Sequence, residues 1–323
     1  MFETALVTLQ NVILSLLFII PGYLALKGKL VNINHSKTLS SILVYVCSPG
    51  LIIGSFLNLD FSLIQLANMG WFMLITVFTQ LVFMMILFFI FKKKHGDNRY
   101  KVLSIASVCS NMGYFGMPIV KALFPNNPEV ACYTSVYVIT MNVLLFTVGI
   151  YFLTGKKEYM SVKQAFLNPA SLSFFVGIIL YVVNARGLID NSVNVSGFLH
   201  DSLKTLEKCV YSLGDMCTPL SMLILGMRLA SMNFKKIFGC PMVYMVVAFK
   251  LIAFPLFSYL CVYFLPFDEV FKATMFILTA APVASSVLNI AEMYGAEEEF
   301  SANVVMVSTL LSVITIPVLT LIL

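Results

Sequence analysis

Charged residues are scarce in this chain. Asp, Glu, Lys and Arg make up 11% of its 323 residues, whereas a soluble domain contains about 25%. Hydrophobic residues make up 60%, and their long runs leave no stretch for a separate soluble domain. This composition predicts an integral membrane protein whose length is taken up by spans, with the lipid bilayer as its partner.

Patterns for metal binding and redox chemistry are missing as well. The three histidines, His35, His95 and His200, lie in predicted loops without ligand spacing around them. The seven cysteines include no CxxC pair and lie mostly in apolar runs, which indicates small buried side chains rather than disulfides. We therefore expect no metal site and no cofactor.

The sequence also lacks the signatures of enzymes and of nucleic-acid binding. It contains no GxSxG, no HExxH, no P-loop and no paired intramembrane carboxylates, so we do not expect an enzyme. The net charge of +5 does not indicate nucleic acid, because the cations lie in short loops between apolar runs. The first apolar run lacks a basic leader and is too long for a signal peptide, so it is predicted to be a span.

Long apolar runs are what the chain does contain. Because a span needs about 20 apolar residues, the sequence predicts ten spans, numbered 1 to 10 in chain order. Their approximate ranges are 4–26, 37–58, 64–91, 101–124, 130–154, 165–186, 204–229, 237–265, 271–293 and 299–322.

Lys and Arg set the predicted orientation, because they are retained on the cytoplasmic side. With the N-terminus outside, the inside loops hold 14 of the 20 basic residues: Lys27, Lys29, Lys37, Lys92, Lys93, Lys94, Arg99, Lys101, Lys156, Lys157, Lys163, Arg228, Lys235 and Lys236. The outside holds five: Lys121, Arg186, Lys204, Lys208 and Lys272. We therefore expect a multi-pass protein of the plasma membrane with both termini outside.

Two of the predicted spans contain helix breakers at their middle. Span 4 carries Asn111, Gly113, Gly116 and Pro118, and span 9 carries Pro282 followed by Ser285 and Ser286. Lipid offers no hydrogen bonds to a broken backbone, so such breaks survive only inside protein or along a water-filled cavity. Ordinary kinks are the alternative reading of each break. Two breaks at matching places favour a secondary transporter, with these seven residues at the substrate site.

The halves of the chain resemble each other weakly. At the start of spans 2 and 7, Lys37-Thr38-Leu39 matches Lys204-Thr205-Leu206, and inside the same spans Cys47-Ser48-Pro49 matches Cys217-Thr218-Pro219. Just before spans 4 and 9, Tyr100-Lys101 matches Phe271-Lys272. The last match places Asn111 opposite Pro282. A repeat of five spans, an odd number, places its second copy upside down in the membrane relative to the first. We therefore expect two inverted five-helix repeats, residues 1–155 and 164–323, in which the two broken helices cross.

Four further polar residues lie inside predicted spans. Lys250 in span 8 is the one basic residue near the middle of a span, and its expected repeat partner is Gln80. An intramembrane charge costs at least about 2.5–3.5 kcal/mol, so Lys250 either binds a substrate carboxylate, carries a coupling proton or neutralises the carbonyl ends of the broken helices. Asp215 faces the cavity or bonds neighbouring groups, and Asn142 faces the breaks or joins helices.

The residues at the breaks also resemble those of a known family. Asn111-Met112-Gly113-Tyr114-Phe115-Gly116-Met117-Pro118, and Pro282 followed by Ala291-Glu292-Met293-Tyr294-Gly295, are similar to the auxin efflux carrier family. Gly22-Tyr23-Leu24, Ser48-Pro49, Pro219-Leu220 and Pro317 add to the resemblance, which covers nearly all ten spans. Plant members carry a proline where this chain has Ser110, and the long loop between spans 5 and 6 of many plant members is absent.

The resemblance implies a fold related to that of bile acid:sodium symporters. A scaffold of spans 1, 2, 6 and 7 would hold a mobile unit of spans 3–5 and 8–10, with small organic anions as substrates. We therefore expect an all-α secondary transporter that works by alternating access, as a monomer or a homodimer. Coupling to protons or sodium is open, as are two alternatives: an ion-coupled carrier of a neutral solute, and a sensor that binds without transport.

Overall fold

The computed structural model describes residues 2–194, 196–231 and 239–323. Apart from one isolated antiparallel bridge, the regular structure of these residues is helical. The first half contains α1 (Phe2–Leu17), α2 (Ile19–Lys27), α3 (His35–Ile42), α4 (Ser48–Leu57), α5 (Leu63–Ile90), α6 (Asn98–Ala106), α7 (Met117–Leu123), α8 (Glu129–Leu144) and α9 (Ile150–Thr154).

The second half continues the all-helical arrangement. It contains α10 (Val162–Leu167), α11 (Pro169–Val182), α12 (Ala185–Asn191), α13 (Gly197–Asp215), α14 (Cys217–Ser231), α16 (Pro241–Ala248), α17 (Phe254–Tyr263), α18 (Glu269–Ala280), α19 (Ser285–Tyr294) and α20 (Glu298–Leu319). Single π-helical turns connect several pairs of helices: η1 (Leu43–Cys47), η3 (Met112–Gly116), η4 (Leu145–Gly149) and η7 (Phe249–Ala253).

Most predicted spans appear as long apolar helices. Seven stretches in the described residues are long and apolar enough to cross a membrane: Glu3–Lys27, His35–Leu57, Leu63–Ile90, Glu129–Thr154, Gly197–Ser231, Pro241–Tyr263 and Glu298–Ile322. An eighth is the pair Lys157–Leu167 and Pro169–Val182, which is bent by 42°. The chain is therefore an integral multi-pass membrane protein. The helix of span 7 begins at Gly197 rather than near 204, and Lys235 and Lys236 lie outside the described residues.

Spans 4 and 9 are each divided into two helices. In span 4 the helix α6 ends at Ala106, and helical structure resumes with η3 at Met112. In span 9 the helix α18 ends at Ala280, and α19 begins at Ser285. The breaks therefore fall where Asn111 and Pro282 predict them. Pro118 lies in the first turn of α7, a position that does not need its missing N–H.

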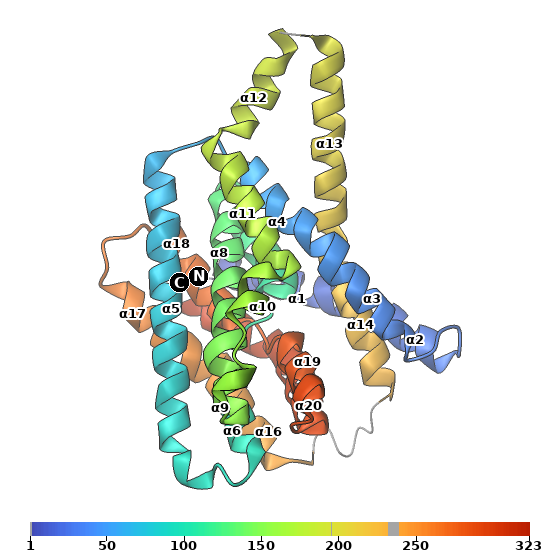
Figure 1. Cartoon of the computed structure of the whole chain (residues 1–323), viewed down its shortest axis with the longest axis vertical. Coiled ribbons are helices and arrows are strands. Elements are labelled where there is room, and N and C mark those ends of the chain that lie inside the picture. The colour runs from blue at the N-terminus through green and yellow to red at the C-terminus, as the bar shows by residue number, and fades with distance from the viewer. Residues whose placement is uncertain (1, 195, 232–238) are drawn as a thin grey trace.

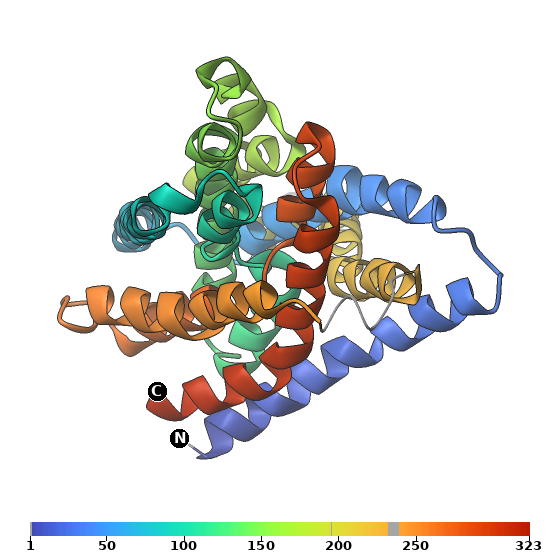
Figure 2. The same ribbon diagram turned by 90° about the horizontal axis from the view of Figure 1, so that it is seen from below.

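The helices gather into two sets, which Figure 2 shows from below. In the first set, α2 packs on α14, and α4 packs on α11 and α13. In the second set, α5 packs on α8, α17 on α18, and α16 and α19 on α20. Helix α1 lies against α20, so the two termini lie together (Figures 1 and 2).

Close backbone contact holds the first set together. A Cβ atom on Gly22 would lie 2.0 Å from the Leu223 carbonyl oxygen, and one on Gly226 would lie 2.1 Å from that of Ile19. Only glycine allows α2 and α14 to approach this closely, as in other membrane helix pairs whose interfaces are lined by small residues. The first set is thus a tightly joined unit beside the second.

Candidate substrate site at the crossing of two broken helices

The two breaks meet and satisfy each other's backbone. Ser110 and Val283 form an antiparallel bridge. The Asn111 N–H donates to the Pro282 carbonyl at 2.7 Å, and the Ala284 N–H donates to the Cys109 carbonyl at 3.0 Å. These bonds replace helical bonds that the breaks remove, which is what a backbone inside a membrane protein requires. The two interruptions that the sequence predicts are therefore in direct contact.

Neighbouring side chains complete the crossing. The Val283 N–H donates to the Ser308 hydroxyl on α20 at 3.1 Å. A Cβ atom on Gly116 would lie 3.1 Å from Leu278 Cδ2, so η3 passes close to the Leu278 side chain of α18. Neither bond of the bridge uses the Ser110 N–H. A proline at this position, as in plant members, would therefore cost the bridge no hydrogen bond.

A cavity of about 240 Å³ adjoins the crossing. It lies between the two helix sets, because its lining comes from α3, α4, α11 and α14 on one side and from the breaks, α8 and α19 on the other. The polar residues of the lining are Ser40, Ser48, Ser110, Asn111, Tyr114, Asn142, Asn168, Ser221, Arg228, Ser285, Ser286 and Asn289.

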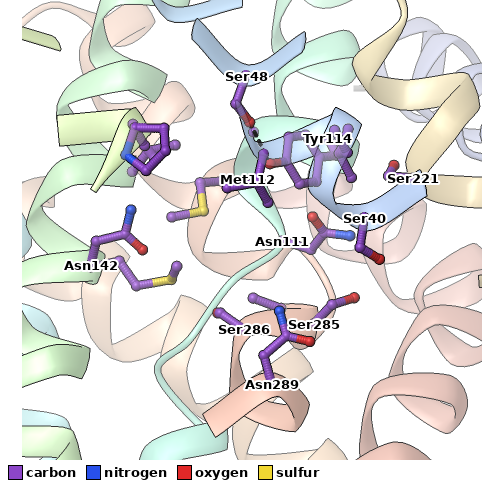
Figure 3. Close-up of a pocket in the computed structure, with 18 of the residues that line it drawn as sticks. Ser40, Ser48, Asn111, Met112, Tyr114, Asn142, Ser221, Ser285, Ser286 and Asn289 are labelled. Carbon is purple, nitrogen blue, oxygen red and sulfur yellow. Dashed lines mark hydrogen bonds between the residues drawn. The ribbon is translucent and has the colours of Figure 1, made fainter. Parts of the chain in front are cut away.

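Several polar groups in this cavity have free hydrogen-bonding capacity (Figure 3). The carboxamides of Asn111, Asn142 and Asn289 are not among the side chains that form hydrogen bonds in the described residues, and the buried Ser286 hydroxyl has no partner there either. Helix α19 begins at Ser285 without a capping side chain. Its positive end therefore lies at the cavity wall, where it suits an anionic group.

Tyr114 joins the two helix sets beside the crossing. Its hydroxyl lies 2.5 Å from that of Ser48 on α4 (Figure 3). Its ring packs on a small apolar cluster from spans 2 and 7: Leu43, Cys47, Cys217 and Ile224. Tyr114 and Ser48 both line the cavity, so this contact links the two sets at the cavity wall.

A second polar contact joins the sets further along α4 and α8. The Ser55 and Ser135 hydroxyls lie 2.8 Å apart, and the Cys132 thiol donates to the Ser55 carbonyl at 3.0 Å. All three side chains are buried. None of these three residues belongs to the cavity lining.

Lys250 and Gln80 do not belong to the cavity lining. Lys250 in η7 is fully buried. Its ammonium donates to the Thr279 carbonyl at the end of α18 and lies 5.3 Å from the Phe254 ring centre. Both amide atoms of Gln80 are buried without a hydrogen-bond partner in the described parts of the chain. The structure thus places Lys250 against the backbone of a broken helix.

The predicted site residues separate into three groups. Asn111, Gly113, Asn142, Ser285 and Ser286 line the cavity. A second group, Gly116, Pro118, Pro282, Lys250 and Gln80, does not belong to the cavity lining. Asp215, the last residue of α13, is exposed and does not line the cavity.

Sequence analysis missed Arg228, Tyr114, Ser48 and Asn289. It assigned Arg228 to an inside loop, but Arg228 lies in the last turn of α14 and lines the cavity. Spacing along α14 could have identified it, because Ser221, Ile224 and Arg228 follow one another at helical intervals on one face. Tyr114 and Ser48 are separated by 66 residues, so only tertiary structure brings them together.

A family model described as membrane transport protein matches residues 7–165 and 158–320. No curated protein shows significant sequence similarity to the chain. No group of three or more His, Cys, Asp or Glu in the described residues is placed to hold a metal ion.

Proposed function

Because the chain belongs to the membrane transport protein family, the family of the auxin efflux carriers, we propose that it is a secondary transporter of a small organic anion. The anion would bind in the cavity beside the crossing and pass by alternating access. The observation that carries this proposal is the cavity itself, which lies between two helix sets and is lined by residues of both broken helices.

The arrangement of the sets supports alternating access. The cavity walls belong to different sets, so a movement of one set against the other would close one side of the site and open the other. The parts of α3, α11, α14 and α19 that line the cavity lie toward the predicted inner ends of their spans. With the orientation expected from Lys and Arg, the cavity would face the inside, and the Ser55–Ser135 contact would lie in the outer half of the interface.

The chemistry of the lining supports an anion. Among the described residues, no acidic side chain belongs to the lining, and the start of α19 supplies a positive helix end. The free carboxamide of Asn111 can donate to a carboxylate. A volume of about 240 Å³ is just below the usual range for drug-sized ligands, which favours a small molecule.

The driving force is an ion gradient, the membrane potential or the substrate gradient, because the sequence carries no nucleotide-binding motif. We propose that the ten spans form two inverted repeats of five, with α6–α7 and α18–α19 as the crossed pair. The breaks meet centred on Ser110 and Val283, which supports a twofold relation between the halves.

Flux in proteoliposomes tests this function. Wild-type protein should take up at least one radiolabelled acid from a panel of malonate, succinate, benzoate and indole-3-acetate, with and without a proton or sodium gradient. Asn111→Leu should abolish uptake at near-normal expression, because it removes the polar group at the crossing, and Asn126→Leu in an exposed loop should not. Binding without flux would identify a sensor instead, and normal uptake by Asn111→Leu would remove Asn111 from the site.

A further inference from the structure

Arg228 is the only charged residue in the lining of the cavity as the described residues define it. It lies in the last turn of α14, one face of which also contributes Ser221 and Ile224 to the wall. These positions follow one another at helical spacing, so the side of α14 that carries Arg228 is the side that faces the cavity.

The guanidinium of Arg228 lacks the partner that the other two arginines of the chain possess. Arg99 pairs with Asp97 at 2.6 Å, and Arg186 pairs with Asp190 at 2.9 Å. Arg228 forms no ion pair in the part of the chain that the structure describes. One of its terminal nitrogens, Nη1, is buried without a hydrogen-bond partner there.

A buried donor of a charged group is costly when it is left unpaired. The acidic side chain whose charge acts on Arg228 is that of Glu292 on α19, but Glu292 is exposed and forms no ion pair with it. An acceptor that enters the cavity can supply the missing hydrogen bond. A carboxylate matches the planar fork of a guanidinium and can accept two hydrogen bonds from it.

We infer that Arg228 binds the carboxylate of the transported anion and makes the cavity selective for acids over neutral molecules of the same shape. This inference rests on the proposed transport function and adds a residue and a substrate class to it. Arg228 belongs to the first helix set, whereas Asn111 and α19 belong to the second. A carboxylate held by Arg228 would therefore be contacted from both walls of the cavity.

The test compares acids with their neutral amides. Full-length wild type, Arg228→Gln and Arg228→Lys are reconstituted, with Arg99→Gln at the exposed start of α6 as the matched control. For each acid of the panel that wild type transports, the KM is measured, and so is the inhibition constant of the corresponding amide, such as benzamide for benzoate. Arg228→Gln should raise the KM of the acid about ten- to a hundredfold, as expected for a lost charged hydrogen bond, and leave the amide within about twofold. Arg228→Lys should lie between, and Arg99→Gln should match wild type.

Two results would overturn the inference. An unchanged KM in Arg228→Gln would mean that the guanidinium only extends toward the membrane surface, and an equal loss for acid and amide would mean that Arg228 only supports the structure. If wild type transports no acid, the proposed function fails, and Arg228 is judged by equilibrium binding of the same acids. Weaker acid binding by Arg228→Gln would then support the inference, whereas unchanged binding, or no binding by wild type, would overturn it.

Discussion

Replacing Lys250 by methionine removes one ammonium group and keeps a side chain of similar length. In the structure this ammonium is fully buried, donates to the Thr279 carbonyl and lies over the Phe254 ring. It does not belong to the cavity lining. Of the three roles that the sequence leaves open, these contacts favour stabilisation of the crossing.

The size of the effect follows from the groups involved. A hydrogen bond from a charged donor contributes about 1.5–3 kcal/mol, and a cation at a helix C-terminus contributes about 0.3–1 kcal/mol. The cost of burying the charge offsets part of both, and methionine is free of that cost. After Lys250→Met the Thr279 carbonyl keeps only a 3.5 Å contact with the Ser110 hydroxyl. We therefore expect a net loss of about 1–2 kcal/mol, or a Tm lower by about 2–8 °C.

Thermal unfolding of purified Lys250→Met, combined with flux, measures this prediction. Substrate affinity should stay within about twofold of wild type in the folded protein, and the exposed Lys208→Met serves as the control with unchanged Tm. Lost affinity at an unchanged Tm would refute the reasoning and give Lys250 a role in substrate binding. Intact exchange that no longer responds to a pH gradient would instead give it a coupling proton.

The helix contacts and the orientation give further predictions. Gly226→Ala should lower the free energy of unfolding by more than about 2 kcal/mol, because the added Cβ would lie 2.1 Å from the Ile19 carbonyl oxygen. Gly70→Ala is the control and should leave stability unchanged, because its Cβ would meet no atom within 4 Å. Equal Tm values in the two variants would contradict the close contact of α2 and α14. In a cysteine-free background, Gly96→Cys should react with an impermeant thiol reagent only after cells are opened, and labelling of intact cells would reverse the orientation.

The crossing could be predicted from sequence because its signal is local. Asn111, Gly113 and Pro282 interrupt apolar runs, and lipid cannot satisfy the backbone that they release. The structure confirms both interruptions and their contact through Asn111 and Pro282. The bounds of span 7 were harder to predict, because the amphipathic start of α13 at Gly197 is too polar to resemble a span.

The walls of the cavity could not be predicted in the same way. Arg228 near the end of an apolar run has the pattern of a cation that sets topology, and only the packing of α14 shows that it lines the site. Tyr114 and Ser48 come from spans far apart in sequence. Lys250 was identified by its cost in the membrane, but its partner, a backbone carbonyl, leaves no sequence pattern.

Alternating access requires the two helix sets to separate at the Ser55–Ser135 contact, where the hydroxyls lie 2.8 Å apart. The most direct test is uptake by Ser55→Cys/Ser135→Cys in a background without native cysteines. Oxidation to a disulfide should stop uptake of the transported acid, and reduction should restore it, while both single variants stay active under oxidation. Uptake at the wild-type rate with the disulfide fully formed would contradict the account.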